Sequence, residues 1–232
     1  MEDYEHAGLY ADLCLKGYSV LMNYSSLDLS TTDIPFSRYN QEVIFHSQMA
    51  ALYGQQLFIL LIDRLFYDEY DEKDLRKIAF YNEDSGSKLV SYKGSYAGKE
   101  NSYSCFSGLA TDEVYLIRAE CFARQGKAVA AMKDLNTLVK TRWLGPYVDL
   151  IATDAEDALK KVLDERKKEL ILRGTRWSDL RRLNRDSRFK VRPTRTVGGK
   201  TYILEPNSYQ YTFPIPDDII QMTGMEQNEG WK

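Results

Sequence analysis

The sequence predicts an all-α protein, made of tetratricopeptide-like helical hairpins together with an irregular, loop-rich region and little β structure. Residues 111–142 carry two stretches of apolar residues at helical spacing, joined at Gly126. Residues 154–172 carry a third such stretch. By contrast, residues 82–110 hold four glycines and three tyrosines with no regular period, which is typical of a long functional loop.

The composition of the 232-residue chain is that of an ordinary globular protein, with 44% hydrophobic and 28% charged residues. We expect a single domain over residues 1–232, with a loop-rich part at 1–110, a helical repeat scaffold at 111–183 and an irregular C-terminal segment at 184–232. The longest uninterrupted apolar run, Leu57–Ile62, has six residues. A membrane-spanning helix needs roughly 20, so we expect no transmembrane segment.

The N-terminal third alternates short helical patterns with loops. Residues 4–22 predict a pair of helices around a turn at Gly17-Tyr18. Residues 25–40 are rich in Ser, Thr and Asp and predict a loop, and residues 41–50 fit a strand or a helix. Leucines spaced along residues 55–67 predict a short helix.

The scaffold begins at Thr111, which is a suitable N-cap for a helix that ends at Gly126. A second helix is expected from about residue 127 to residue 142. The apolar spacing across both helices is similar to that of a tetratricopeptide repeat: Ala119, Phe122, Gly126, Ala131, Leu135 and Leu138. Because one such pair cannot bury its own apolar face, further helices must stack on it.

The third scaffold helix is expected to begin at Thr153 as N-cap, with Glu156 three residues later completing a capping box. Gly174 interrupts the pattern, and residues 175–183 add one or two further helical turns.

The C-terminal segment is mostly polar. Gly198-Gly199, flanked by strand-prone residues, predicts a small hairpin. Phe213–Pro216 is expected to be extended, because each residue before a proline avoids the helical region. Asp217 is then expected to cap a short helix.

Metal, thiol and cofactor chemistry are not indicated by the sequence. The three cysteines, Cys14, Cys105 and Cys121, are far apart, and His6 and His46 are the only histidines, so an ordinary zinc site is excluded. The chain has no phosphate-binding loop or dinucleotide-binding fingerprint. We therefore expect no metal and no cofactor, and we expect Cys121 to be a small core residue.

The charge distribution does not predict a nucleic-acid partner. The net charge is −3, although residues 165–195 hold 12 Lys/Arg against 4 Asp/Glu. These charges follow a helical pattern, so an ion-paired helix face is the expected interpretation.

Glu165 and Glu169 lie one helical turn apart, as a general acid and base could. However, Glu169 precedes Arg173 by four residues, and Asp164 precedes Lys168 by four, which is the favourable orientation for ion pairs. We therefore assign these carboxylates to the scaffold and predict no catalytic residue.

Tyrosine is abundant, with 17 in the chain. A tyrosine ring offers an apolar face and a hydroxyl at its rim, which suits stacking on sugar rings or wet protein interfaces. Tyr18 and Tyr115 fit the helical core. The loop tyrosines are the ligand candidates: Tyr39, Tyr53, Tyr92, Tyr96 and Tyr103.

Six segments, in order along the chain, resemble those of the SusD/RagB family. The main one runs from Asp164 to Leu170, continues through Gly174, and ends with Arg176-Trp177-Ser178-Asp179-Leu180-Arg181-Arg182; it is similar to the family's E-R-x-x-E-L, glycine, R-W-x-D-L-x-R signature. The others are Lys16 to Leu21, Asn40 to Phe45, Asp74-Leu75-Arg76, Asp112 to Glu120, and the ending Phe213 to Pro216 with Gln227 to Trp231, in which Glu229 replaces a proline.

The resemblance covers this whole chain but about the C-terminal half of a typical member. It implies a non-enzymatic, lipid-anchored protein on the outer-membrane surface of Bacteroidetes-type bacteria, with a lipid anchor outside this chain. Such proteins bind oligosaccharides or other nutrients and cover a SusC-like, TonB-dependent transporter. The family's ligand surface often follows the segment at 40–45, which favours His46, Tyr53 and Gln55.

The resemblance also implies a structural role for the signature residues on their rigid helices: Glu165, Arg166, Glu169, Gly174, Arg176, Trp177 and Asp179. Two other functions stay open on the residues alone. One is a tetratricopeptide-type protein-interaction adaptor, which needs several regular repeats. The other is an α-helical glycan-active enzyme, which needs Glu165 or Glu169 as a catalytic group.

Overall fold

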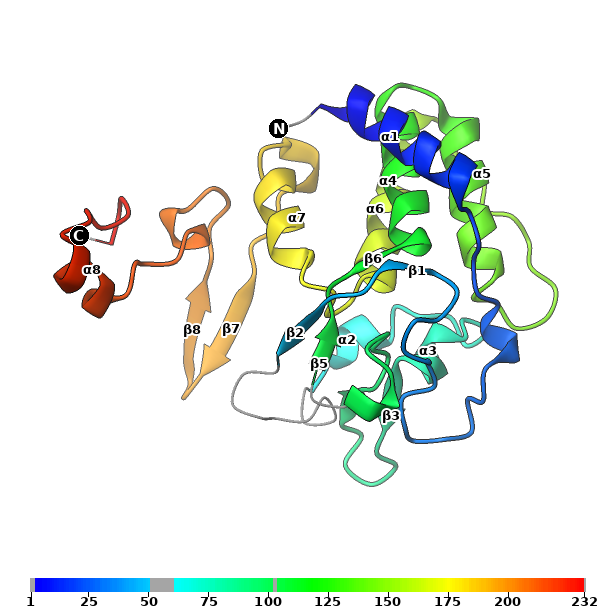
Figure 1. The fold of residues 1–232 in the computed structure, drawn as a ribbon, viewed down its shortest axis with the longest axis horizontal. Helices are drawn as coiled ribbons and strands as arrows, with labels where there is room; N and C mark the ends of the chain where they lie inside the picture. The colour runs from blue at the N-terminus through cyan, green and yellow to red at the C-terminus, as the bar shows by residue number, and fades with distance from the viewer. Residues whose placement is uncertain (1–2, 51–60, 102–103, 232) are drawn as a thin grey trace. The chain divides into compact units, whose positions relative to one another are not determined.

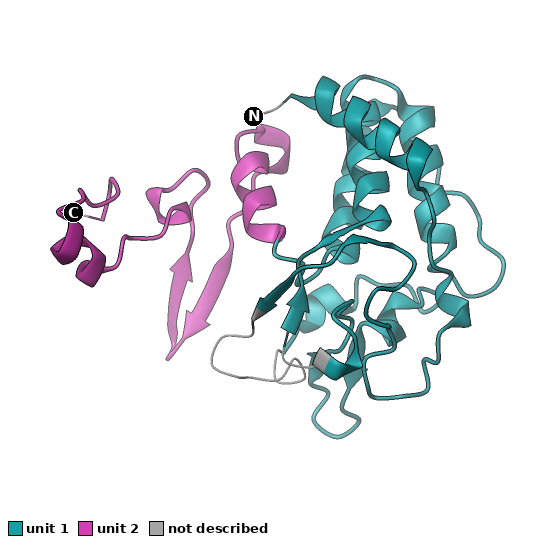
Figure 2. Cartoon of the chain, viewed as in Figure 1, with its two compact units in different colours: residues 1–174 teal, residues 175–232 magenta. Residues whose placement is uncertain are grey.

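A computed structural model describes residues 3–50, 61–101 and 104–231 (Figure 1). The chain divides into two compact units, unit 1 at residues 1–174 and unit 2 at residues 175–232 (Figure 2). The prediction of a mainly helical chain is confirmed. The expected division of a single domain at residues 110 and 183 stays a prediction.

Unit 1 combines helices with short strands. Its helices are α1 (Tyr4–Gly17), α2 (Arg64–Tyr67), α3 (Arg76–Ala79), α4 (Thr111–Arg124), α5 (Ala128–Lys140) and α6 (Ala155–Glu169), with 3-10 turns at Tyr24–Ser26 and Lys99–Asn101. Its strands are β1 (Val43–Phe45), β2 (Gln48–Ala50), β3 (Tyr81–Glu83), β4 (Val90–Tyr92), β5 (Ser104–Phe106) and β6 (Leu109–Ala110).

Unit 2 contains α7 (Arg176–Leu183), β7 (Thr194–Val197), β8 (Lys200–Ile203) and α8 (Asp217–Thr223), with 3-10 turns at Ser187–Phe189 and Tyr209–Tyr211. The predicted hairpin at Gly198-Gly199 is confirmed as β7–β8. Within the described residues no helix combines the length and the apolar character that crossing a bilayer requires.

The strands pair as two-stranded antiparallel ribbons: β1 with β6, β2 with β5, β3 with β4, and β7 with β8. The prediction of an all-α fold with little β structure therefore included the β7–β8 hairpin but not the three ribbons of unit 1. Residues 41–50, which fitted a strand or a helix, form strands. Because β5 and β6 immediately precede α4, β1 and β2 are held beside the start of that helix (Figure 1).

Helix α4 is the centre of the helical layer and packs against α1, α5 and α6. Ala119 and Ala131 are fully buried where α4 and α5 pack together. On the α1 side, a Cβ added at Gly8 would lie 3.0 Å from Cys121 Cβ, so these helices approach closely. Cys121 is buried, as predicted. The predicted pair of helices, α4 and α5, is confirmed. The pair alone does not establish a tetratricopeptide repeat.

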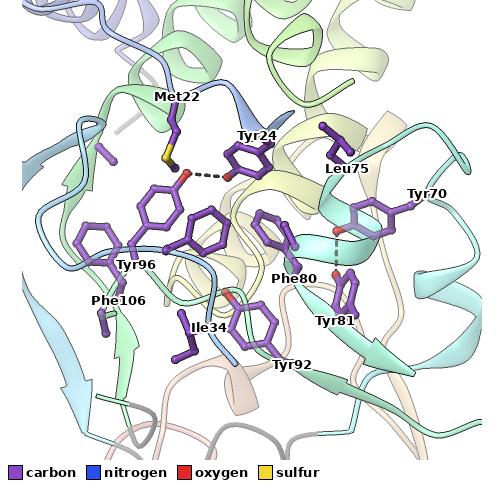
Figure 3. Close-up of a cluster of buried hydrophobic side chains, with 14 of the residues drawn as sticks. Met22, Tyr24, Ile34, Tyr70, Leu75, Phe80, Tyr81, Tyr92, Tyr96 and Phe106 are labelled. Carbon is purple, nitrogen blue, oxygen red and sulfur yellow. Dashed lines mark hydrogen bonds between the residues drawn. The ribbon is translucent and has the colours of Figure 1, made fainter. Parts of the chain in front are cut away.

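A second core, beside the helices, is built largely from aromatic rings (Figure 3). Tyr24, Phe36 and Tyr96 are almost fully buried, and their rings pack at tilted angles with centroids about 5 Å apart. Their polar atoms are satisfied internally, since the hydroxyls of Tyr24 and Tyr96 lie 2.7 Å apart. Likewise, the Tyr81 hydroxyl donates to that of Tyr70 at 2.9 Å.

The predicted helix pair at residues 4–22 is wrong in its second half, because the chain is extended after α1. Side chains from elsewhere bond this backbone in place of a helix. The hydroxyl of Thr111 donates to Val20 O at 2.5 Å, that of Tyr115 donates to Ser19 O, and Met22 N donates to Glu42 Oε1. The prediction that Thr111 is the N-cap of α4 is therefore wrong, because the N-cap is Ala110.

The predicted helix at 55–67 is also shorter than expected. Residues 55–60 lie outside the described residues, and α2 begins only at Arg64. Before it, Ile62 N donates to Val90 O at 2.8 Å, so this stretch pairs beside β4. Asp217 is the first residue of α8 rather than its cap, since the N-cap is Pro216.

The N-cap of α6 is Asp154, one residue after the predicted Thr153. The Asp154 carboxylate accepts from Glu156 N at 2.9 Å and from Asp157 N at 2.8 Å. Asp157, in turn, accepts from Thr153 N at 2.9 Å. The capping interaction is therefore shifted by one residue from the predicted one.

Asp154→Ala is expected to lower the free energy of unfolding by about 1 kcal/mol, because two amides at the start of α6 lose their acceptor. Thr153→Ala serves as the control and is expected to change it by less than about 0.5 kcal/mol, since its backbone N–H still bonds Asp157. Urea denaturation followed by circular dichroism measures both. The reverse ranking would restore Thr153 as the cap.

Candidate functional site

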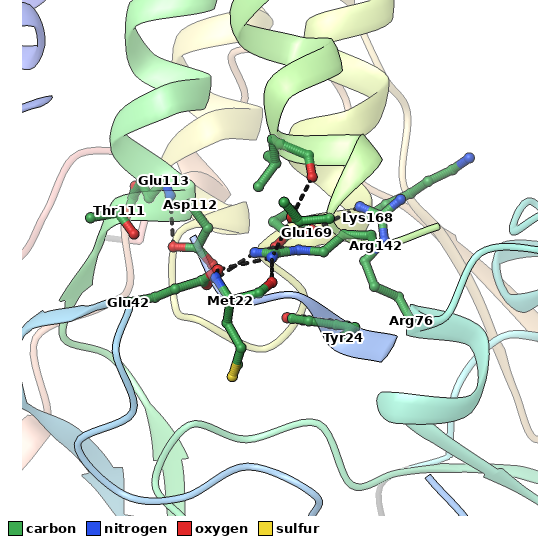
Figure 4. A network of polar contacts seen from close by, with 12 residues as sticks. Met22, Tyr24, Glu42, Arg76, Thr111, Asp112, Glu113, Arg142, Lys168 and Glu169 are labelled. Atoms are coloured by element: carbon green, nitrogen blue, oxygen red, sulfur yellow. Dashed lines mark hydrogen bonds and ion pairs between the residues drawn. The ribbon is translucent and has the colours of Figure 1, made fainter. Parts of the chain in front are cut away.

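A fully buried arginine, Arg142, joins the loop-rich part of unit 1 to its helices (Figure 4). Its guanidinium donates to Glu42 at 2.8 and 3.0 Å and to Glu169 at 3.0 and 2.7 Å. A further bond of 2.8 Å reaches Met22 O, and the ring of Tyr24 lies 4.2 Å from the guanidinium carbon. Two buried carboxylates thus share one arginine.

Arg76 is the second buried arginine of this network. It bonds Asp74 through Nε at 2.9 Å and Nη2 at 2.5 Å, and it donates to Glu169 at 2.8 Å. It also forms an ion pair with Glu165. Asp74 is buried, although it follows the acidic residues Asp68, Glu69, Asp71 and Glu72 in the sequence. It orients Arg76.

A third buried pair lies at the start of α4, where Arg173 Nη1 donates to Asp112 Oδ2 at 3.1 Å. The guanidinium carbon also lies 4.5 Å from the ring centroid of Phe106. The predicted i,i+4 ion pairs are therefore wrong. Glu169 pairs with Arg142 and Arg76 instead of Arg173. Asp164 pairs with Lys160 instead of Lys168.

Burial sets the protonation of these carboxyl groups. It raises the pKa of Asp112 to about 6, although the charge of Arg173 opposes the shift, and it raises the pKa of Glu165. Burial acts in the same direction on Glu169, but the charges and hydrogen bonds of Arg142 and Arg76 outweigh it and lower the pKa of that carboxyl group. Glu169 is therefore the anionic centre of the network.

In the described part of the chain, one group of carboxylates has a spacing that a metal ion could use. One oxygen each from Glu42, Asp112 and Glu169 lies within 4.8 Å of the others. Arg142 and Arg173 already supply positive charge to these oxygens. The arrangement therefore fits an ion-paired support, and we assign it neither a metal nor an acid–base role.

A surface that could bind a ligand lies beside β1 and β2 and is formed by Arg38, Tyr39, His46 and Gln48; we call it the Tyr39–His46 surface. Tyr39 is 63% exposed. Tyr39 has a backbone φ of 58°, in the left-handed region that a bulky residue rarely adopts. Strain of this kind is characteristic of ligand-contacting positions.

His46 packs against Tyr39, with ring centroids 4.7 Å apart, and Arg38 lies over the Tyr39 ring at 4.7 Å. Gln48 Nε2 lies 2.9 Å from His46 Nε2, so the amide donates to this nitrogen. Among the described residues, His46 Nδ1 has no hydrogen-bond partner. Burial and the charge of Arg38 lower the pKa of His46, so that the ring is neutral at pH 7.

Two of the other predicted ligand residues, Tyr92 and Tyr96, do not join this surface. Tyr92 and Tyr96 are 3% and 2% exposed and belong to the aromatic core, so the position in a loop-rich segment that made them ligand candidates does not expose their rings. Tyr53, Gln55 and Tyr103 lie outside the described residues.

The two tyrosines assigned to the core also differ in outcome. Tyr115 is buried, as predicted, whereas Tyr18 is 43% exposed and its assignment to the core is wrong. Tyr18 donates its hydroxyl to Gln41 O at 2.6 Å, and so it joins the extended segment after α1 to the segment before β1.

The remaining signature residues lie around the end of α6 and in α7. Arg166 donates to Glu113 at 3.0 Å. Gly174 has a φ of 80°, which requires glycine, and an added Cβ would lie 3.0 Å from Met49 Sδ. In α7, Arg176 is exposed, and Asp179 is buried and accepts from Arg182 at 2.8 Å.

Trp177 helps to hold an extended backbone segment in unit 2, where three consecutive carbonyls each accept from a side-chain N–H. The donors are Trp177 to Tyr211 O at 3.1 Å, Trp231 to Thr212 O at 2.8 Å, and Asn228 to Phe213 O at 2.7 Å. A signature residue, Trp177, and two residues of the C-terminal ending, Asn228 and Trp231, therefore hold the same backbone segment.

More than half of the chain, toward its C-terminus, matches a known protein family. The family model described as the SusD family matches residues 87–231. No curated protein sequence matches this chain.

Among solved structures, the surface glycan-binding protein A from Bacteroides uniformis has a TM-score of 0.71 at 15% identity, over 97% of this chain and 56% of its own. A putative sugar-binding protein from Bacteroides vulgatus has a TM-score of 0.69 at 21% identity, over 99% of this chain and 56% of its own. A SusD-like carbohydrate-binding protein from the same species has a TM-score of 0.63 at 21% identity, over 95% of this chain and 55% of its own.

This chain thus spans little more than half the length of these structures, which support its fold. The family model covers more than half of this chain, including the signature at Glu165–Arg182 and the C-terminal ending. The chain therefore belongs to the SusD family.

Proposed function

We propose that this chain binds glycans at the outer-membrane surface of a Bacteroidetes-type bacterium, as part of a nutrient-uptake system. In this role it delivers oligosaccharides to a SusC-like, TonB-dependent transporter, and a lipid anchor attaches it to the membrane. Membership of the SusD family supports this role over a tetratricopeptide adaptor, and similar structures carry the names of glycan-binding proteins.

The Tyr39–His46 surface is the proposed ligand contact, and the exposed, strained Tyr39 is the observation that carries it. Sugar rings present faces rich in C–H groups that pack on an aromatic ring, while their hydroxyls bond polar groups at the rim. Arg38 and Gln48 supply donors beside Tyr39, and the neutral His46 gives the ring a rigid neighbour. Tyr53, Gln55 and Tyr103 stay candidates for the same contact.

The proposal involves binding and no reaction. Glu165 and Glu169, the carboxylates that a glycan-active enzyme would need, are buried among arginines on the helical side of unit 1. A substrate-binding cleft that reached them would have to displace this network.

Tyr39→Ala is expected to weaken glycan binding by roughly tenfold, about 1.4 kcal/mol, without changing the melting temperature. Removing an exposed ring costs stacking area but little packing. Isothermal titration calorimetry against a panel of oligosaccharides, begun with a ligand that the parent chain binds, measures the effect. Tyr10→Ala is the matched control, because Tyr10 is 66% exposed on α1.

Equal weakening by Tyr10→Ala, or unchanged binding by Tyr39→Ala, would place the ligand elsewhere. A lower melting temperature together with weaker binding would make Tyr39 a packing residue.

A further inference from the structure

The sequence concentrates positive charge in one short stretch of unit 2. Residues 176–200 hold nine Lys/Arg and two Asp/Glu, a net charge of +7. The remaining residues hold 22 Lys/Arg and 32 Asp/Glu, a net charge of −10. The chain is therefore strongly polarised in charge, and this stretch is its positive pole.

The register of the β7–β8 hairpin sorts its side chains onto two faces. Arg195 is opposite Tyr202 and Val197 is opposite Lys200, so these four side chains share one face, which we call the basic hairpin face. Lys200 Nζ lies 5.1 Å from the centroid of the Tyr202 ring, as this placement requires. The other face carries Thr194, Thr196, Thr201 and Ile203, where the Thr196 and Thr201 hydroxyls lie 3.1 Å apart.

The hairpin is exposed along its full length, on both faces. Within the described residues, neither Arg195 nor Lys200 forms an ion pair with a carboxylate. Val197 is 62% exposed and Tyr202 is 53% exposed between these two bases. An isolated two-stranded hairpin is marginally stable in water, so packing of one face against a partner would stabilise it.

The combination of side chains on the basic hairpin face points to the chemistry of the partner. Two bases attract phosphate groups, and a tyrosine and a valine beside them suit the layer just below those phosphates, where aromatic and apolar side chains are favoured. A bilayer offers phosphates for the two bases and an apolar layer for both Val197 and Tyr202.

From this juxtaposition we infer that the basic hairpin face docks unit 2 on an anionic lipid surface. The phosphate headgroups bond Arg195 and Lys200, and the side chains of Val197 and Tyr202 enter the interfacial layer. The nearby exposed base Lys190 strengthens the long-range attraction, whereas the charge of Arg192 is balanced by its ion pair with Glu205. This inference is independent of the proposed glycan binding.

Co-sedimentation with vesicles tests the inference on the full 232-residue chain. The chain is expected to bind vesicles of about three parts phosphatidylethanolamine to one part phosphatidylglycerol at about 0.05 M NaCl, and to be released at about 0.5 M, because salt screens the charges. Vesicles of phosphatidylcholine alone are expected to bind it weakly.

The variant Arg195→Gln/Lys200→Gln is expected to lower the partition coefficient about thirty-fold, since each base near an anionic surface contributes about 1 kcal/mol. Lys133→Gln/Lys140→Gln removes the same charge from exposed positions on α5 in unit 1 and is expected to leave the coefficient within about threefold. Circular dichroism confirms that each variant is folded.

A second pair of variants tests the face rather than the charge. Val197→Gln is expected to lower the partition coefficient about fivefold through lost apolar burial, whereas Ile203→Gln, on the opposite face, leaves it unchanged. No binding of the parent chain to anionic vesicles overturns the inference. So does an equal loss with the α5 control variant or with Ile203→Gln. Binding to soluble polygalacturonate without binding to vesicles also overturns it, and assigns the bases to an acidic polysaccharide.

Discussion

Arg142→Met is expected to lower the free energy of unfolding by about 5 kcal/mol, which would leave the chain marginally folded at best. The substitution leaves Glu42 and Glu169 as buried carboxylates that have lost a shared guanidinium. Removing one partner of a buried ion pair costs about 3–5 kcal/mol, and Arg142 serves two. Urea denaturation monitored by circular dichroism measures the loss.

Lys140→Met is the matched control, because Lys140 is exposed two residues earlier in the chain. It is expected to change stability by less than about 0.5 kcal/mol. A similar small change for Arg142→Met would mean that the network does not hold the fold.

The coupling between Arg142 and Glu42 provides a sharper test. The effect of Glu42→Gln on the free energy of unfolding is expected to change sign when Arg142 is absent. Glu42→Gln lowers stability in the parent chain, because it removes the charge that Arg142 pairs with. In the Arg142→Met background the same change is expected to raise stability, because it removes an uncompensated buried charge. If Arg142→Met alone does not fold, recovery of soluble protein by the double variant gives the same answer. Equal losses in both backgrounds would show that the residues are uncoupled.

Gly108→Ala is expected to destabilise the chain by roughly 3 kcal/mol through overpacking. An added Cβ would lie 2.0 Å from Phe45 O and 2.7 Å from Phe106 Cζ, so β1 or the Phe106 ring must move. The carbonyl is backbone and cannot rotate aside as a flexible side chain can. The melting temperature measures the effect.

Gly86→Ala is the control for Gly108→Ala. At Gly86 the nearest atom to an added Cβ is a side-chain oxygen of Asp84 at 3.6 Å, which is ordinary contact. This change is expected to be neutral or to stabilise by up to about 1 kcal/mol, because alanine restricts the unfolded chain. If the two variants melt alike, the close approach of β1 and residue 108 is absent in solution.

The helices α4, α5 and α6 could be predicted from the sequence because their cause is local. Each has apolar residues at helical spacing, and Gly126 ends the first in a left-handed conformation with a φ of 79°. The predicted N-cap of α6 is one residue too early because Thr153 and Asp154 are both good caps, and only the backbone geometry selects between them.

The ribbons and the aromatic core could not be predicted in this way, because their cause is not local. Strands of two or three residues carry no detectable period, and they are stable only through partners such as β6, which pairs with β1 from far along the chain. The sequence favours a loop surface for Tyr96, yet its hydroxyl bonds Glu42, which is 54 residues away. Burial of this kind depends on the whole fold.

The candidate site could be predicted in part. The sequence identifies Tyr39 and His46 as ligand candidates, and the structure brings their rings together. Arg38 and Gln48 are absent from that prediction, and no pattern in the sequence distinguishes them from other polar residues. Arg142 is absent from it as well, since a lone arginine after a helix is usually solvated, whereas this one is buried by carboxylates from two distant segments.

The position of Arg142 in the chain has a consequence for folding. Its partners lie 120 residues before it at Met22, 100 residues before it at Glu42, and 27 residues after it at Glu169. Contacts between such distant segments slow folding, because their loops must close first. The buried network is therefore expected to form late, and the aromatic rings beside it, such as that of Tyr24, stay exposed until it does.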